Sequence, residues 1–155
     1  MIISFILAVV IVIIDQLLKM LVVNTIKTSG TVEILGGIVK FDYVENRGMA
    51  FGMLQNYRWV FIIFTLIVIS GLVIYMIKSK PTNKLFITSI TLIVGGGIGN
   101  LIDRIILGYV VDYIQLSFFN PVCNFADYCI TIGTVLLIVY IIFFTQNNNK
   151  STKLE

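Results

Sequence analysis

Aspartates are the residues best suited to carry chemistry in this chain of 155 residues. The chain contains no histidine and only two cysteines, Cys123 and Cys129. The lack of histidine excludes Ser-His and Cys-His nucleophilic pairs and histidine-based zinc sites, and two cysteines are too few for a zinc cluster or a disulfide framework. Acid-base chemistry is therefore left to carboxyl groups. Two carboxyl groups held close together share one proton, and such a pair can activate water against an amide carbonyl.

Four aspartates lie near the ends of apolar stretches: Asp15, Asp103, Asp112 and Asp127. A charged side chain costs roughly 2.5–3.5 kcal/mol at the centre of a bilayer, so the ones that are kept there are usually paired or functional. Asp112 lies inside the apolar run 110–114 and has no helix of its own to cap. The loop that separates it from Asp127 is long enough to fold back. These two residues are the candidate pair.

Most of these aspartates also have a purely structural interpretation. Asp15 and Lys19 are one helical turn apart and could form an ion pair within the first helix. Asp103, with the arginine that follows it, would suit an anchor at the membrane interface. Asn124 and Asp127 could cap the last helix, the first as its N-cap and the second near its positive end.

The elements that position these residues are predicted to be membrane helices. The chain is 58% hydrophobic and 12% charged, with a mean hydropathy of +1.01, which is too apolar for a soluble domain of this size. Apolar stretches of about the ~20 residues needed to cross a bilayer occur at roughly 2–23, 58–77, 85–104 and 127–145. We expect an all-α polytopic membrane protein with four transmembrane helices, folded as one membrane-embedded domain over residues 1–155.

Lysines indicate which end of the predicted bundle faces the cytoplasm. The connection 78–84 holds three lysines and no acidic residue, as is typical of cytoplasmic loops. The tail, with Lys150 and Lys153, falls on the same side if there are four helices. Both termini are therefore predicted to be cytoplasmic.

The outer segment 24–57 has room for non-helical structure. Residues 32–34 and 39–43 alternate between apolar and polar on either side of Gly36 and Gly37, a pattern that predicts a β-hairpin. We expect an extracytoplasmic hairpin whose amphipathic strands could lie on the membrane surface.

The polar residues near the helix ends all fall on one side of the predicted bundle, because successive helices cross in alternate directions. They are Asp15, Lys19, Asn46, Arg47, Asn100, Asp103, Arg104, Asp112, Asn124 and Asp127. The amides and the guanidinium among them could orient a substrate and stabilise developing negative charge. The glycines at 95, 96, 97 and 99 favour close helix packing rather than phosphate binding, since neither a strand nor a Lys-Ser/Thr pair accompanies them.

Five sequence blocks together resemble the lipoprotein signal peptidases, also called signal peptidase II. In chain order they are DQLLK at 15–19, NRGMAF at 46–51, GGGIGNLIDR at 95–104, GYVVD at 108–112 and NFAD at 124–127. The resemblance implies an aspartyl endopeptidase of the bacterial plasma membrane, with four transmembrane helices and a small β-cradle on the outer surface. Such enzymes remove the signal peptide from prolipoproteins by cutting before the cysteine that already carries a diacylglyceryl group.

The resemblance also implies roles for individual residues. Asp112 and Asp127 would be the catalytic pair. Substrate binding would fall to Asn46, Asn100, Arg104 and Asn124, and support of the site to Asp15, Lys19, Asp103 and Gly48. No metal or cofactor is expected. The partners would be lipidated prolipoproteins and membrane lipids, with the enzyme acting as a monomer. Two features depart from the family pattern: Cys123 stands where phenylalanine is usual, and the loop 113–122 is short.

Other functions account for the sequence less well. A proton- or ion-coupled transporter would place its carboxylates near the bilayer midplane between repeats, whereas these lie at predicted helix ends and no repeat is visible. A non-enzymatic membrane subunit leaves the clustered aspartates unexplained. Nucleic-acid binding has no support, because the net charge of +3 is small and scattered.

Overall fold

The computed structural model describes residues 2–48 and 57–145. Within these ranges, four helices are long and apolar enough to cross a membrane: Ile2–Ser29, Arg58–Ser79, Lys84–Ile106 and Phe125–Phe144. The first consists of α1 (Ile2–Asn24) and the short α2 (Ile26–Ser29), and the others are α3 (Arg58–Ser79), α4 (Lys84–Ile106) and α5 (Phe125–Tyr140), which ends in a π-helical turn (Ile141–Thr145). The predicted multi-pass membrane architecture is confirmed.

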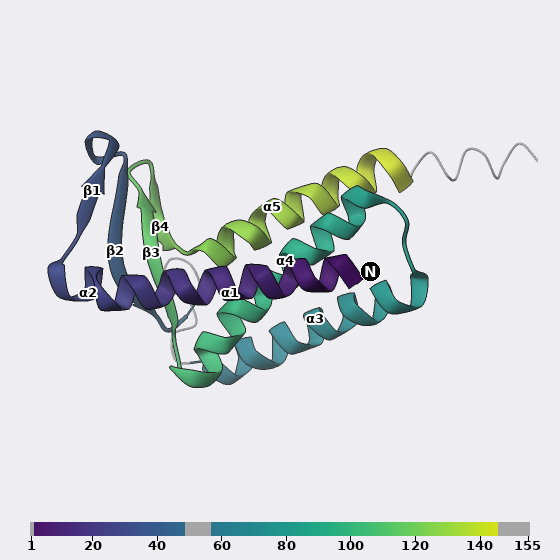
Figure 1. Ribbon diagram of the computed structural model, residues 1–155, viewed down its shortest axis with the longest axis horizontal. Helices are drawn as coiled ribbons and strands as arrows, with labels where there is room; N and C mark the ends of the chain where they lie inside the picture. The colour runs from purple at the N-terminus through teal and green to yellow at the C-terminus, as the bar shows by residue number, and fades with distance from the viewer. Residues whose placement is uncertain (1, 49–56, 146–155) are drawn as a thin grey trace, which may run out of the picture.

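Helix α4 lies at the centre of the bundle and contacts α1, α3 and α5 (Figure 1). Its glycines permit this position. A Cβ atom at Gly96 would lie 2.5 Å from the carbonyl oxygen of Ala126 on α5, and one at Gly95 would lie 2.9 Å from Cγ2 of Ile11 on α1. The interpretation of these glycines as close-packing residues is therefore confirmed. The helices around α4 carry most of their large apolar side chains on the outside, as expected for contact with lipid.

A four-stranded antiparallel sheet completes the fold, so the expectation of an all-α protein is wrong. Its strands are β1 (Val32–Ile34), β2 (Val39–Asn46), β3 (Val110–Leu116) and β4 (Phe119–Cys123), in the order β1-β2-β3-β4. The predicted hairpin is present as β1 and β2. Strands β3 and β4 come from a segment that we expected to be a loop. The β3 sequence VVDYIQL is rich in β-branched and aromatic residues, and it forms a strand because β2 offers a pairing edge.

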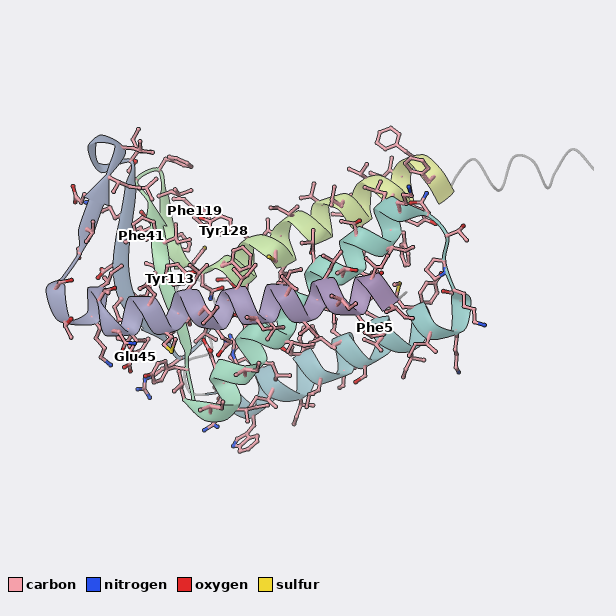
Figure 2. The ribbon with its side chains drawn as sticks, viewed as in Figure 1. Phe5, Phe41, Glu45, Tyr113, Phe119 and Tyr128 are labelled. Carbon is pink, nitrogen blue, oxygen red and sulfur yellow. The ribbon has the colours of Figure 1, made fainter. Side chains whose placement is uncertain are left out.

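The sheet lies at one end of the bundle, with its strands running across the helix axes (Figure 1). Figure 2 shows Phe41, Tyr113 and Phe119 at this end and Phe5 at the opposite end. A cluster of buried apolar residues that includes Val22 of α1 and Tyr113 of β3 fixes the sheet to the bundle. Because β3 follows α4 and β4 precedes α5, the end of α4 and the start of α5 lie next to the sheet. Helix α1 also contacts β3, so three helices meet the sheet in one place.

Candidate active site

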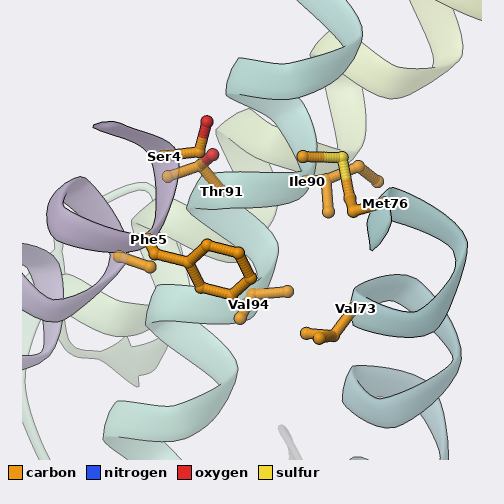
Figure 3. A pocket seen from close by; sticks show the side chains of 8 residues that line it. Ser4, Phe5, Val73, Met76, Ile90, Thr91 and Val94 are labelled. Atoms are coloured by element: carbon orange, nitrogen blue, oxygen red, sulfur yellow. The ribbon is translucent and has the colours of Figure 1, made fainter. Parts of the chain in front are cut away.

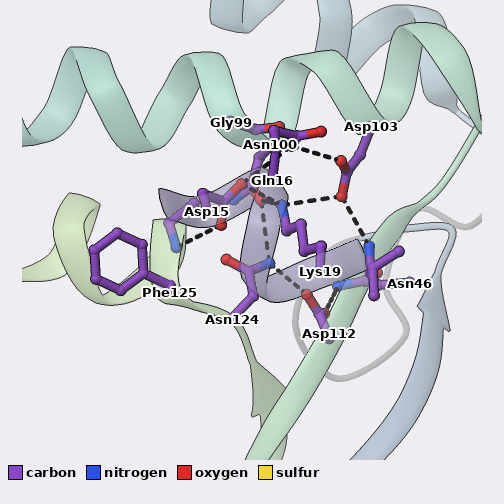
Figure 4. A network of polar contacts seen from close by, with 12 residues as sticks. Asp15, Gln16, Lys19, Asn46, Gly99, Asn100, Asp103, Asp112, Asn124 and Phe125 are labelled. Carbon is purple, nitrogen blue, oxygen red and sulfur yellow. Dashed lines mark hydrogen bonds and ion pairs between the residues drawn. The ribbon is translucent and has the colours of Figure 1, made fainter. Parts of the chain in front are cut away.

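A buried ion cluster lies where α1 meets α4 (Figure 4). The Nζ atom of Lys19 is 2.8 Å from Oδ2 of Asp15 and 2.9 Å from Oδ2 of Asp103, and all three side chains are almost completely buried. The i,i+4 pair considered from the sequence is present. Asp103, however, is a partner of Lys19 in the interior rather than an interfacial anchor. A buried lysine is tolerated here because two carboxylates compensate its charge.

The two carboxylates of this cluster also hold the backbone of neighbouring elements. Asp15 Oδ1 accepts a hydrogen bond from the backbone N–H of Ala126 at 3.1 Å, and Asp103 Oδ2 accepts one from Val111 at 3.0 Å. Gln16 donates to Asp103 Oδ1 at 3.0 Å. The start of α5 and the start of β3 are thereby fixed against α1 and α4. Sequence reasoning gave Gln16 no role, although an amide between two charged residues of an apolar helix was a usable signal.

Asp112 lies on β3 with only 1% of its surface exposed. Its Oδ2 accepts a hydrogen bond from Asn46 at 2.7 Å, and its Oδ1 accepts one from Asn124 at 2.6 Å (Figure 4). Burial, reinforced by the nearby carboxylate of Asp127, raises the pKa of Asp112 to about 7, although the two amide hydrogen bonds act in the opposite direction. Asp112 can therefore keep its proton at a pH at which an ordinary aspartate is ionised.

Asp127 lies in the first turn of α5 and is held by two asparagines. Asn100 donates to its Oδ1 at 2.8 Å, and the backbone N–H of Asn124 donates to its Oδ2 at 3.1 Å. The backbone N–H of Asp127 in turn donates to Oδ1 of Asn124 at 2.9 Å, which completes a capping box. The capping interpretation is correct. The side-chain amide of Asn124 also donates a hydrogen bond to Asp112. One residue therefore both caps α5 and connects the two candidate carboxyl groups.

Asn100 connects the ion cluster to this pair. Its Oδ1 accepts hydrogen bonds from Lys19 at 2.9 Å and from the side-chain amide of Asn124 at 3.1 Å, while its own amide donates to Asp127. The charge of Lys19 thus orients Asn100 with its N–H toward the carboxylate. Fixed amide dipoles of this kind stabilise charge that develops in a reaction.

A cleft of about 470 Å³ opens beside Asp112 and Asp127. Polar residues line one end of it: Asn46, Gly48, Asn100, Arg104, Asp112 and Asp127. Apolar side chains of three helices also line it: Phe61, Phe64, Val68 and Ile69 of α3, Ile93 of α4 and Ile130 of α5. Thr65, Gly97 and the β4 residues Pro121, Val122 and Cys123 complete the lining. The cleft therefore joins a polar end, where both carboxyl groups are found, to an apolar wall among the membrane-crossing helices.

Arg104 and Gly48 face each other across the polar end. Arg104 Nη2 donates to the Gly48 carbonyl at 3.4 Å, and its guanidinium lies 5.0 Å from the centre of the Phe61 ring. Gly48 N–H donates to Oδ1 of Asn46 at 3.0 Å, which orients the Asn46 amide toward Asp112. The remainder of the NRGMAF block, residues 49–51, lies outside the described residues.

The predicted site residues thus fall into two groups. Asn46, Gly48, Asn100, Arg104, Asp112 and Asp127 line the cleft, and Asn124 contacts both carboxyl groups while being fully buried. Asp15, Lys19 and Asp103 form the ion cluster behind them. Sequence reasoning gave no role to the cleft residues Phe61 and Phe64, which their apolar surroundings in α3 did not distinguish, and it treated Cys123, which also lines the cleft, only as a departure from the family pattern.

A second, apolar crevice lies at the opposite end of the bundle between α1, α3 and α4 (Figure 3). Phe5, Val73, Ile90 and Val94 are among its lining residues, and none of the described residues that line it is ionisable. This crevice therefore differs from the polar cleft, which is lined by two carboxyl groups and an arginine.

The arrangement in the polar cleft suits hydrolysis of an amide. Two coupled carboxyl groups lose their protons in separate steps, so an intermediate pH range leaves one proton on the pair. The ionised member can take a proton from water while the protonated member donates one to a carbonyl oxygen. Asn46, Asn100 and Arg104 supply donors around the same cleft.

Comparison with known proteins also indicates a peptidase. The family model for signal peptidase (SPase) II matches residues 7–143. A lipoprotein signal peptidase of Halothermothrix orenii is 42% identical over 137 residues, covering 88% of this chain and 93% of the relative. One of Clostridioides difficile is 41% identical over 136 residues, covering 86% and 90%.

Solved structures agree with these sequence relatives. A bacterial membrane enzyme determined by the in meso method at 2.3 Å resolution superposes with a TM-score of 0.85 at 34% identity, covering 93% of this chain and 90% of that one. A second, at 1.9 Å resolution, gives a TM-score of 0.82 at 33% identity, with coverages of 91% and 93%. Because the family model matches residues 7–143 of the 155 in this chain, the chain belongs to the signal peptidase II family of aspartic endopeptidases.

Proposed function

We propose that this protein removes the signal peptide from prolipoproteins by cutting before their diacylglyceryl-modified cysteine, with Asp112 and Asp127 as its catalytic pair. The observation that carries the proposal is that both carboxyl groups line one cleft and are hydrogen-bonded to the same residue, Asn124. They come from a strand and a helix that are separate in the sequence, and the capping box of α5 accounts for Asp127 but not for the buried carboxyl group of Asp112.

In the proposed reaction, one carboxylate takes a proton from water and the protonated partner donates to the carbonyl oxygen of the scissile amide. The water oxygen bonds to the carbonyl carbon, and the C–N bond then breaks as a proton passes to the leaving nitrogen. The products are the carboxyl terminus of the signal peptide and the free amino group of the lipidated cysteine. Asp112 is the favoured proton donor, because burial raises its pKa to about 7.

The cleft suits a substrate that arrives from the membrane. Its apolar wall, formed by α3, α4 and α5, can receive the helical signal peptide, and its polar end then meets the peptide bond where the helix ends. The acyl chains of the substrate can remain in the surrounding lipid, so no deep acyl pocket is needed.

We further propose that the protein resides in the bacterial cell membrane as a monomer, with the sheet and the polar cleft on the outer face. The connection between α3 and α4, with Lys78, Lys80 and Lys84, lies at the opposite end of the bundle and supports a cytoplasmic position there. In this orientation both termini are cytoplasmic, and the cleft faces the side to which lipoproteins are exported.

The test is a cleavage assay with purified protein in lipid, using a diacylglyceryl-modified precursor and its unlipidated counterpart. The variants are Asp112→Asn and Asp127→Asn. Asp42→Asn is the matched control, because Asp42 lies on the same sheet but its carboxylate binds only the backbone N–H of the next residue among the described contacts. We expect the wild type and the control to cleave the lipidated precursor alone, and both dyad variants to be inactive yet folded.

Two results would contradict the proposal. Full processing by either dyad variant would remove that residue from the catalytic pair. Equal cleavage of the two precursors would show that the diacylglyceryl group is not recognised, and would point to a different peptide substrate.

A further inference from the structure

A small cavity lies at the rim of the bundle, where α3 begins and α4 ends (Figure 1). Its volume is about 280 Å³, and its lining residues are Arg47, Arg58, Leu107 and Gly108. Two guanidinium groups therefore share one cavity, and no aspartate or glutamate is among the described residues that line it. Guanidinium groups bind phosphate through paired hydrogen bonds and stay charged at physiological pH. The lining thus favours an anion as the ligand.

Arg58 keeps a charge and hydrogen-bond donors that the described part of the chain does not use. None of the ion pairs formed there includes Arg58, and the preceding segment 49–56 contains no acidic residue. Its Nη2 donates to the carbonyl oxygen of Ile105 at 2.6 Å, which satisfies one of the last carbonyls of α4. Its Nε is buried without a hydrogen-bond partner among the described residues. Because a guanidinium has five N–H donors, the bond to Ile105 leaves others available to a ligand.

Arg47 reaches the same cavity from the position that follows β2. Its guanidinium carbon lies 5.3 Å from the centre of the Tyr109 ring, and its Nη2 is 2.8 Å from Oε2 of Glu45. Glu45 is shared, because its Oε1 lies 3.7 Å from Nζ of Lys27. One carboxylate thus faces two cations, and together with Arg58 these residues carry three positive charges and one negative charge. An anionic ligand in the cavity reduces this excess of positive charge.

The side chains around the cavity place it at the boundary between lipid and water. Tyr57 and Trp59 flank Arg58 in the sequence and are largely exposed, and both residue types are enriched at the level of lipid headgroups. On the other side of the cavity, Ile105 and Ile106 are also exposed, at the end of a helix long and apolar enough to cross the membrane. The two arginines therefore lie at the depth of the phosphate groups of one leaflet.

We propose that Arg47 and Arg58 bind the phosphate group of a phospholipid from the leaflet on the side of the sheet. A phospholipid is favoured over a free phosphate ion because exposed apolar side chains of two membrane-crossing helices, among them Trp59 and Ile106, border the cavity and can contact its acyl chains. The bound lipid holds Arg47 and thus the adjacent Gly48, which lines the polar cleft. The lipid site itself is independent of the proposed peptidase activity.

The test uses Trp59, the single tryptophan of the chain, as a reporter beside the site. Its ring centre lies 5.4 Å from the guanidinium carbon of Arg58. Purified protein in a maltoside detergent is titrated with phosphatidylglycerol or with a glycosyl diacylglycerol that lacks phosphate, both with the same brominated acyl chains. The variants are Arg47→Gln and Arg58→Gln. Lys40→Gln is the matched control, because it removes the same charge from β2 outside the cavity.

We expect brominated phosphatidylglycerol to quench Trp59 half-maximally at a mole fraction about tenfold lower than the brominated glycolipid, as for a hydrogen bond between charged groups. Each arginine variant should raise this mole fraction by about tenfold, and Lys40→Gln should leave it unchanged. Each protein is compared with its own fluorescence before lipid is added. An excess of inorganic phosphate should not relieve the quenching by phosphatidylglycerol.

Three results would overturn the proposal. Equal quenching by the two lipids would show that the phosphate group is not recognised. An equal loss of affinity in Lys40→Gln and the arginine variants would indicate a general effect of charge. Relief of the quenching by inorganic phosphate would show that the site takes the free ion. Because Arg47 is exposed to solvent, its substitution leaves the fold intact and decides the question even if Arg58→Gln fails to fold.

Discussion

Asn124 donates its side-chain amide to Oδ1 of Asp112 over 2.6 Å. The same residue is the N-cap of α5, and its backbone N–H holds Asp127. One asparagine thus sets the relative position of two carboxyl groups that come from different elements.

Replacing Asn124 separates its capping role from its bridging role. Asn124→Ser retains a good N-cap, so the stability of α5 should change by only a few tenths of a kcal/mol, but serine is too short to reach Asp112. We expect kcat/KM to fall by about 100-fold, as for the loss of a positioned donor in an active site, and the loss of the buried amide to lower the free energy of unfolding by about 1–3 kcal/mol. Full activity of this variant would show that the contact with Asp112 is dispensable.

Activity should fall as the pH rises through neutrality. Burial and the neighbouring Asp127 raise the pKa of Asp112 to about 7, so Asp112 keeps its proton below this pH and loses it above. Because the proposed mechanism needs one proton on the pair, kcat/KM should decline by about tenfold per pH unit above the pKa. The measurement is a pH profile with lipidated precursor.

Asn46 provides the control for this pH profile. Its hydrogen bond stabilises the ionised form of Asp112 and thus lowers the pKa. Asn46→Ala should therefore move the alkaline limb of the profile to higher pH. A profile that is flat across the neutral and alkaline range, or a limb that moves downward in Asn46→Ala, would contradict the assignment of Asp112 as the proton donor.

Removing Lys19 should destabilise the fold strongly. Lys19→Met leaves Asp15 and Asp103 buried without their cation, which should cost about 3–5 kcal/mol. Lys40→Met is the matched control, because the Lys40–Glu33 pair is about half exposed to solvent, with 37% and 53% of the two side chains accessible, and is worth at most about 1 kcal/mol. Unfolding in a denaturing detergent series measures both. Equal stability of the two variants would show that the buried cluster is no more important than a surface pair.

Alanine substitutions at two glycines of the membrane helices should have different effects on the free energy of unfolding. At Gly96 the added Cβ would lie 2.5 Å from the carbonyl oxygen of Ala126, a backbone atom one residue before Asp127. Gly96→Ala should separate α4 from α5, with an expected loss of about 1–3 kcal/mol from overpacking and reduced cleavage. Gly71 on α3 has no atom of the described residues within 4 Å of such a Cβ. Gly71→Ala should be neutral or stabilising by up to about 1 kcal/mol; a matching loss in both variants would contradict this explanation.

The helices of this protein were predictable because their signal is local. Each apolar stretch is long enough to cross a bilayer without reference to any other part of the chain. The β1–β2 hairpin was predictable for the same reason, since its strands flank Gly36 and Gly37. Alternation of helix ends also placed the polar residues on one side, with no knowledge of the packing.

Strand β3 contains strand-forming residues, but the pairing of β3 and β4 into the sheet was not predictable from their own residues. The segment 110–123 is short and carries Asp112 and Pro121, which are unfavourable in strands. It becomes part of the sheet because β2 pairs with it, and β2 lies on the far side of α3 in the sequence. Pairing between such distant segments depends on the packing of the helices that separate them, and no local pattern records it.

The sequence by itself determined that carboxyl groups are the available acids and bases and that they gather at one end of a membrane bundle. Only the tertiary structure decided which of them share a cleft and which are neutralised by Lys19. The physical reason is that burial and hydrogen bonding, rather than residue type, distinguish Asp112 and Asp127 from Asp15 and Asp103. These environments exist only once α1, α4, α5 and β3 are packed together.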